Sequence, residues 1–183
     1  MNPYLILLRG INVGGKNIIP MAELRIMLAE DGFVDVATYI ASGNVLLSSD
    51  LPAAEVKTRI EEVLAKNFNL DDGFVKALVL TPAQMQAVID GKPPGFGEEP
   101  EKYHSDVLFL MELDARAVMP IFDPREGVDQ VWPGDGVIYS QRLSALRSKS
   151  RLNKIMGSPT YKSMTIRNWN TTTKLLEMMK QRH

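Results

Sequence analysis

The order of apolar segments in the first 80 residues is the feature that most constrains the fold. Short continuous apolar runs predict buried strands, and apolar side chains at helical spacing predict amphipathic helices. In chain order the segments are residues 4–9 (strand), 20–33 (helix), 34–49 (hairpin), 53–68 (helix) and 73–80 (strand). The resulting order, β-α-β-β-α-β, is typical of a ferredoxin-like subdomain.

A similar order recurs in the second half of the chain. It follows a short helix at residues 82–90 and an irregular connection at residues 91–100, where six of the ten residues are Gly or Pro. The later segments are residues 105–113 (strand), 114–122 (short helix, capped by Asp114), 126–141 (hairpin), 147–157 (basic helix), 161–167 (strand) and 170–181 (helix). We therefore predict an α+β protein of two ferredoxin-like (β-α-β-β-α-β) subdomains with an added C-terminal helix. The predicted boundaries are 1–80, a connecting segment 81–103, and 104–183.

Composition excludes several classes of site. The chain has no Cys, which excludes disulfides, thiolate metal ligands and cysteine nucleophiles. Its two imidazoles belong to His104 and to the last residue, His183, so neither a zinc site nor a Ser-His-Asp hydrolase is indicated. We predict no metal and no cofactor. The apolar run in residues 1–10 is too short to cross a membrane and lacks the features of a secretory signal, which predicts a cytoplasmic protein without a membrane partner.

Charge is segregated along the chain. Residues 1–139 hold 11 Lys and Arg against 21 Asp and Glu, whereas residues 140–183 hold 10 Lys and Arg against Glu177 alone. The net charge of −1 therefore conceals a basic C-terminal region with its own positive field. Two interpretations stay open: this region packs against the acidic remainder of the chain, or it binds an anion.

The loop after the first strand fits the G-x-x-x-x-G-K frame of a phosphate-binding loop between Gly10 and Lys16. Two features argue against a nucleotide hydrolase. Asn17 stands where a magnesium-binding Ser or Thr is needed, and Pro20 places the helix start four residues beyond Lys16. The loop is then either a plain turn or one wall of an anion or nucleotide site built from Arg9, Asn12 and Lys16.

Three blocks of sequence resemble the bacterial family called domain of unknown function 1697. They are "LLRGINVGGKN–PMAELR", "TYIASGNVLLSS" and "TIRNWNTTTKLLEMM", which together flank nearly the whole chain. The resemblance implies two ferredoxin-like subdomains. It implies no established reaction and transfers no functional residues.

The candidate ligand-binding residues come from these blocks and from the basic region. They are Arg9, Asn12, Lys16, Asn17, Ser42, Asn44, Lys149, Arg167, Asn168 and Asn170. Several also have a purely structural interpretation. Ser42 and Asn44 fit hairpin-turn chemistry, Asn168 or Asn170 fits a helix N-cap, and Trp169 fits a core anchor better than a stacking platform.

Three functions follow from these observations. The leading hypothesis is the binding of an anionic ligand, nucleic acid or a nucleotide, through the basic C-terminal region. The first alternative is an enzyme acting on a small phosphorylated or carboxylated substrate in an inter-domain cleft, with Arg9, Lys16, Lys149 and Arg167 as the anion site and no residue marked as general base. The second is a protein-interaction module or homo-oligomer, in which the ten Met residues supply an adaptable surface.

Overall fold

The chain divides into two compact units in the computed structural model, which describes residues 1–71 and 75–182. The first unit comprises Met1–Met85 and Leu175–His183, and the second comprises Gln86–Lys174. The predicted domain boundaries at residues 80 and 104 stay a prediction; the division into units differs from them at residues 175–183, which group with the first unit. The start of the strand predicted at residues 73–80, and His183, lie outside the described residues.

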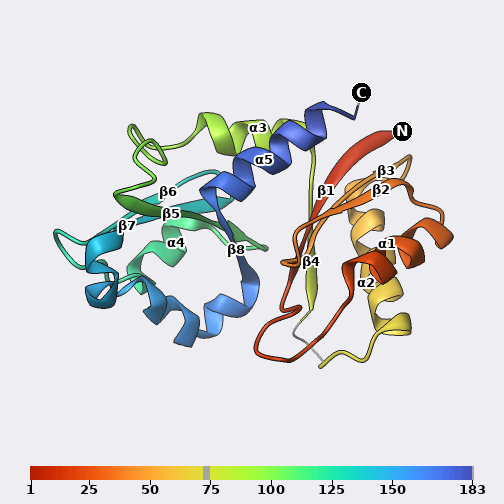
Figure 1. The fold of residues 1–183 in the computed structure, drawn as a ribbon, viewed down its shortest axis with the longest axis horizontal. Coiled ribbons are helices and arrows are strands. Elements are labelled where there is room, and N and C mark those ends of the chain that lie inside the picture. The colour runs from red at the N-terminus through yellow and green to blue at the C-terminus, as the bar shows by residue number, and fades with distance from the viewer. Residues whose placement is uncertain (72–74, 183) are drawn as a thin grey trace. The chain divides into compact units, whose positions relative to one another are not determined.

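Four strands form an antiparallel sheet in the first unit, in the order β2-β3-β1-β4. They are β1 (Asn2–Arg9), β2 (Val34–Tyr39), β3 (Asn44–Ser49) and β4 (Lys76–Leu80). Two helices, α1 (Met21–Glu30) and α2 (Ala53–Asn67), lie on one face of this sheet (Figure 1). The predicted strands, helices and hairpin of this unit are confirmed within a few residues at their ends, apart from residues 73–74.

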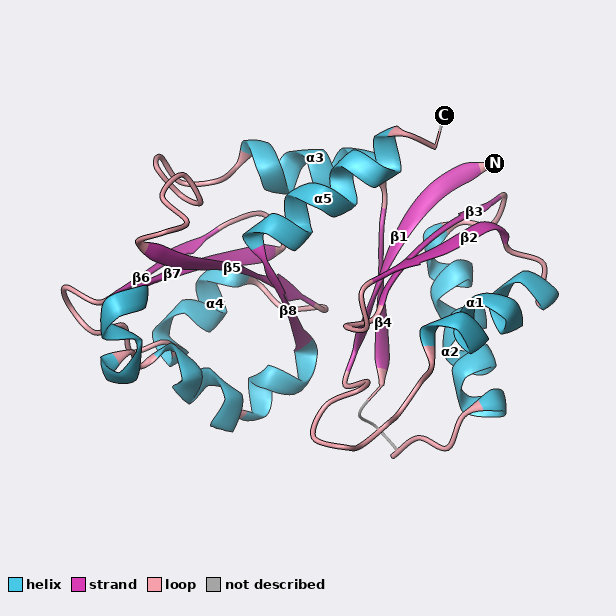
Figure 2. Cartoon of the chain, in the orientation of Figure 1, coloured by secondary structure: helices cyan, strands magenta, loops and turns pink. Residues whose placement is uncertain are grey.

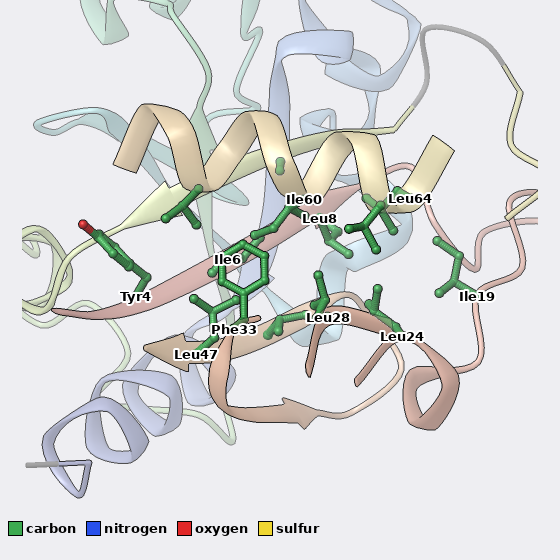
Figure 3. Packing of buried hydrophobic residues seen from close by; sticks show 14 of the residues in the cluster. Tyr4, Ile6, Leu8, Ile19, Leu24, Leu28, Phe33, Leu47, Ile60 and Leu64 are labelled. Atoms are coloured by element: carbon green, nitrogen blue, oxygen red, sulfur yellow. The ribbon is translucent and has the colours of Figure 1, made fainter. Parts of the chain in front are cut away.

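The core of the first unit lies between this sheet and the two helices. Figure 3 shows Ile60 and Leu64 of α2 pointing toward Ile6 and Leu8 of β1, with Leu28 of α1 in the same cluster. All five side chains are at most 1% exposed. Burial of each large aliphatic side chain contributes roughly 1.5–3 kcal/mol, so the apolar periodicity of these segments accounts for the packing.

The second unit contains a sheet with a corresponding strand order, β6-β7-β5-β8, in which all neighbours are again antiparallel. Its strands are β5 (Tyr103–Leu110), β6 (Asp129–Pro133), β7 (Val137–Leu143) and β8 (Met164–Asn168). The predicted cap is confirmed, because Asp114 accepts a hydrogen bond from the Ala117 amide at 3.2 Å and starts α4 (Ala115–Val118). A 3₁₀ turn, η1 (Met119–Ile121), continues α4.

The basic helix predicted at residues 147–157 is wrong. The chain instead forms three short 3₁₀ segments (Figure 2), which are η2 (Ser144–Lys149), η3 (Leu152–Gly157) and η4 (Pro159–Ser163). Between η2 and η3, Ser150 is extended and the Asp129 carboxylate accepts a hydrogen bond from the Arg151 amide at 2.8 Å. That contact holds the amide in a non-helical position, so one continuous helix cannot form.

The Gly/Pro-rich connection is anchored by an aromatic cluster inside the second unit. Phe96 is 1% exposed and packs edge-on against Trp132, Tyr139 and Trp169, with ring centroids 6.0, 5.3 and 5.2 Å away. The Tyr139 hydroxyl donates to the carbonyl of Val88 at 2.6 Å. Trp169 is 8% exposed, which agrees with the predicted core anchor.

Two further helices complete the chain: α3 (Pro82–Asp90) and α5 (Trp169–Lys180). Both were predicted from apolar spacing. The α+β class with two antiparallel sheets is therefore confirmed, and the finer ferredoxin-like assignment is taken up as a proposal below. Among the described residues, no helix has the length and apolar character needed to span a membrane.

We predict that Gly97→Ala destabilises the protein more than Gly95→Ala. Both glycines have a positive φ, +74° and +78°, so each alanine costs about 1 kcal/mol in backbone strain. A Cβ on Gly97 would also lie 2.2 Å from Cδ1 of Trp169, whereas one on Gly95 meets nothing within 4 Å. The overlap adds about 2 kcal/mol, to be measured by urea unfolding. Equal losses in the two variants would contradict tight packing of Gly97 on the Trp169 ring.

Candidate functional site

The lysine loop between β1 and α1 is held by the side chain of Asn12. Its Nδ2 donates to the carbonyls of Ile19 and Ala41 at 3.0 and 2.9 Å, and its Oδ1 accepts from the Ile19 amide at 2.8 Å. Asn12 has φ = 52°, a left-handed conformation that asparagine tolerates better than most residues. The amide group of Asn12 is therefore occupied by the backbone of the loop and of the neighbouring hairpin.

Asn17 has a similar role on the other side of the loop. Its Nδ2 donates to the Gly10 carbonyl at 2.8 Å, and its Oδ1 accepts from the Asp71 amide at 2.7 Å. The side chain is 7% exposed and φ is 49°. The two asparagines are also joined directly, because the Asn12 amide donates to the Asn17 carbonyl at 3.0 Å.

The tip of the loop presents Lys16 to solvent. Gly14 and Gly15 adopt positive φ, and the Lys16 amide donates to the Val13 carbonyl at 3.0 Å, which closes a tight turn. Helix α1 begins at Met21, five residues after Lys16, so the lysine does not stand at a helix N-terminus as a nucleotide-binding loop needs. A shallow hollow beside it is lined by Gly15, Lys16, Asn17, Ile18, Asn69 and Asp71. Arg9, in contrast, is buried at the end of β1.

Ser42 and Asn44 shape the turn between β2 and β3. Asn44 is fully buried, and its Nδ2 donates to the Tyr39 carbonyl at 3.0 Å and to the Ser42 hydroxyl at 2.9 Å. Gly43 between them has φ = 84°, and a Cβ there would lie 2.9 Å from Cβ of Leu8. These contacts are those expected of hairpin-turn chemistry.

The other candidate residues belong to the second unit. Arg167 on β8 is 6% exposed, and its Nη1 donates to the Thr165 hydroxyl at 2.7 Å and to the Ile166 carbonyl at 2.8 Å. Burial lowers the pKa of Arg167 to about 10. Asn168 Oδ1 accepts from the Asn170 amide at 2.9 Å and so caps α5, as predicted for one of the two asparagines.

The structure thus joins the candidates in small groups rather than in one constellation. Asn12 and Asn17 are hydrogen-bonded, as are Ser42 with Asn44 and Asn168 with Asn170, while Lys149 is exposed at the end of η2. Six of the ten lie in the first unit and four in the second. Among the described residues, no three His, Asp or Glu side chains are grouped as a metal site requires.

Part of the positive charge of the basic segment at residues 144–163 is neutralised by ion pairs within the second unit. Arg151 and Lys154 both contact Asp123, at 3.2 and 3.0 Å, and the hydrogen bond from Lys154 is the main cause that lowers the pKa of Asp123. Arg147 and Lys149 on η2 are exposed, and neither side chain has an ion pair among the described residues. They form the uncompensated part of the segment.

A polar pair that the sequence analysis missed lies at the start of β5. His104 Nε2 is 2.9 Å from Asp106 Oδ2, with side chains 42% and 21% exposed. Burial raises the pKa of Asp106, against the opposing charges of His104 and Arg142. The signal was present, because residues two apart on a strand share a face. The prediction missed it because it began the strand at Ser105 instead of Tyr103.

The first three quarters of the chain match a known protein family. The model of the family described as "Protein of unknown function (DUF1697)" matches residues 1–139. The chain belongs to this family. The resemblance inferred from the three sequence blocks is thereby confirmed.

One solved structure, that of the conserved bacterial protein SP0830 from Streptococcus pneumoniae, is similar to nearly the whole chain. It covers 97% of this chain and 98% of its own, at 28% identity and with a TM-score of 0.83. No curated protein matches the chain. Neither the description of the family nor that of the Streptococcus pneumoniae protein assigns an activity.

We predict that Asn17→Ala destabilises the protein, whereas Lys16→Ala does not. The alanine removes two hydrogen bonds, so that the Gly10 carbonyl and the Asp71 amide lose this partner, and strains a positive φ, for a loss of about 2–4 kcal/mol. Lys16 is exposed, so its truncation stays within about 0.5 kcal/mol. Thermal and urea unfolding of the two variants tests this, and equal stability of both would contradict the bracing role of Asn17.

The stability of the second unit depends on pH through the carboxylate of Asp129. Burial alone would raise its pKa, but hydrogen bonds from the amides of Arg151 and Arg125 and from Ser150, with the nearby charge of Arg142, together lower it below its usual range. A lowered folded-state pKa stabilises the protein above the pKa of the unfolded chain, and this stabilisation is lost as the pH falls through the folded-state value.

We therefore predict that Asp129→Asn lowers the free energy of unfolding near about pH 7 by about 1–3 kcal/mol and flattens the loss of stability below about pH 4. Asp123→Asn is the matched control, since it removes a carboxylate that is exposed and paired only with side chains. Urea unfolding between about pH 3 and 7 measures both effects. An equal or larger loss in the control variant would contradict the role given to Asp129.

Proposed function

We propose that both units are ferredoxin-like. In each, the first strand of the unit lies centrally between the third and fourth, and the second strand lies at an edge, as in a split β-α-β arrangement. The first unit supplies both expected helices, α1 and α2. In the second unit, α4 is the first helix, and the 3₁₀ segments η2–η4 stand where the second helix is expected.

We propose further that the protein binds an anionic ligand, with nucleic acid or a nucleotide as the favoured class, through its basic C-terminal region. The observation that carries this proposal is the pair Arg147 and Lys149, exposed on η2 and without an ion pair among the described residues. No Asp or Glu occurs in the sequence between Asp135 and Glu177, so no acidic neighbour in the segment offsets them. A cytoplasmic location, where such ligands occur, is part of this proposal.

Phosphate contacts explain why such a surface would favour a polyanion. A lysine or arginine that neutralises a phosphate releases a condensed counterion, and each such contact steepens the salt dependence of binding. Arg151 and Lys154 already share Asp123, so they contribute less of this effect than Arg147 and Lys149. The surface is therefore expected to be modest in affinity and without base specificity.

The enzyme alternative gains one observation, the His104–Asp106 pair, which can hold an imidazole in one orientation as a general base needs. The anion site of this alternative is less well supported. Two of its four residues, Arg9 and Arg167, are only 7% and 6% exposed. The protein-interaction alternative stays a prediction. We therefore keep anion binding as the favoured function.

The test measures fluorescence anisotropy of a labelled RNA and DNA oligonucleotide of about 20 nucleotides at about 50 and 200 mM salt. We predict that the double variant Arg147→Ala/Lys149→Ala binds more weakly and reduces the slope of log K against log salt by about 2. The control, Arg25→Ala/Lys66→Ala, removes two exposed cations from α1 and α2 and is expected to bind like the native protein. Absence of binding at the lower salt, or equal losses in both doubles, would contradict the proposal.

A further inference from the structure

The first unit carries three aliphatic side chains that its core leaves uncovered. Val13 and Ile18 in the lysine loop are 67% and 58% exposed, and Ile40 in the turn between β2 and β3 is 52% exposed. A single exposed aliphatic residue is ordinary, whereas several on adjoining segments are typical of an interaction surface. The three belong to one surface because the loop and the turn are joined.

The side chain of Asn12 makes this junction. Its Nδ2 donates to the carbonyl of Ile19 in the loop and to that of Ala41 in the turn, at 3.0 and 2.9 Å. Ile18 and Ile40 directly precede these two residues in the chain. One nitrogen atom therefore holds both backbones within hydrogen-bonding distance, and the lysine loop lies against the tip of the hairpin.

The backbone at Ile40 is strained. Its φ is 49°, in the left-handed region that a β-branched residue rarely adopts and that Gly or Asn adopts at lower cost. The side chain is half exposed, so burial in the core of the unit does not fully offset this strain. A costly residue held at the surface is what a contact with another molecule would explain.

Two charges of opposite sign border the aliphatic side chains. Lys16 pairs with Val13 across the turn of the loop, and Asp71 lines the same hollow as Lys16 and Ile18. Both charged side chains are exposed, and neither forms an ion pair among the described residues. A surface that combines apolar side chains with one unpaired cation and one unpaired carboxylate is complementary to a second copy of itself.

We propose that this surface is a homodimer interface, in which two copies of the chain meet around a two-fold axis. It consists of Val13, Lys16, Ile18, Ile40 and Asp71. In such an isologous contact the aliphatic side chains of the two copies pack together, and Lys16 of each copy faces the carboxylate of Asp71 of the partner subunit. The surface is small, so the dimer is expected to be weak and to exchange with the monomer.

The experiment is analytical ultracentrifugation of the full chain. We predict that the weight-average mass rises from that of the monomer toward that of the dimer between about 10 and 500 µM protein. Ile40→Asn tests the apolar contact, and asparagine tolerates the left-handed backbone, so a loss of association cannot be attributed to unfolding. We expect this variant to weaken association by about fivefold or more, because each copy loses one aliphatic contact.

A charge exchange tests the two-fold arrangement. Lys16→Glu and Asp71→Lys change exposed side chains, and each is expected to weaken self-association by about fivefold, because like charges then meet in both halves of the interface. An equal mixture of the two variants is expected to associate at least as well as the native protein, because both ion pairs of the mixed dimer again join opposite charges.

The double variant Arg147→Ala/Lys149→Ala is the control. It removes the cations of the proposed anion-binding surface and is expected to dimerise like the native protein, so the two proposals succeed or fail separately. A constant monomer mass up to about 500 µM protein would overturn the dimer proposal. Undiminished association of Ile40→Asn, or a mixture that associates no better than either charge variant alone, would also overturn it.

Discussion

Burial of the Trp169 ring is the constraint on which much of the second unit depends. The ring packs 5.2 Å from Phe96 and lies so close to Gly97 that no side chain fits between them. Because Trp169 is also the first residue of α5, the same contact fixes the start of that helix and orders the Gly/Pro-rich connection. Without it, the connection would have few apolar contacts to offset the entropy of its ordering.

The positive charge that the second unit presents to solvent depends on which of its Lys and Arg side chains form ion pairs with carboxylates. The basic segment crosses a region that contains Asp123 and Asp129, and these carboxylates take up Arg151, Lys154 and an amide that would otherwise continue a helix. The same carboxylates that compensate the charge of residues 144–163 therefore also favour 3₁₀ turns over a continuous α-helix in this segment. Exposed cations are what is left after this compensation, which is a narrower basis for ligand binding than the sequence total of +9 in residues 140–183 suggests.

Local rules predicted most of the elements of the fold, but they missed the break in the basic segment and the His104–Asp106 pair, for physical reasons that particular residues make clear. Periodicity located β1, α1 and α2 because their burial depends on neighbours at fixed spacing. The helix predicted at residues 147–157 failed because a single carboxylate, Asp129, more than twenty residues away in the chain, captures the Arg151 amide. His104 was overlooked for a related reason. Its spacing from Asp106 on the same strand is local, but the register that places Arg142 opposite it on β7 joins distant strands and is not written in local spacing.

Several residues that carry the family resemblance use their side chains to hydrogen-bond main-chain groups of the protein. Asn12, Asn17, Asn44 and Asn168 each bond to main-chain groups that a turn or helix end would otherwise leave unpaired, so a sequence pattern built on them identifies a fold rather than a ligand. A ligand must instead meet groups that the fold has not used. Among the described residues these include Lys16, Lys149 and the side chain of Asn170, together with the free ring nitrogen of His104. Lys16 and Asn170 lie inside the three blocks, whereas Lys149 and His104 lie outside them, so the blocks alone do not identify the groups that the fold leaves unused.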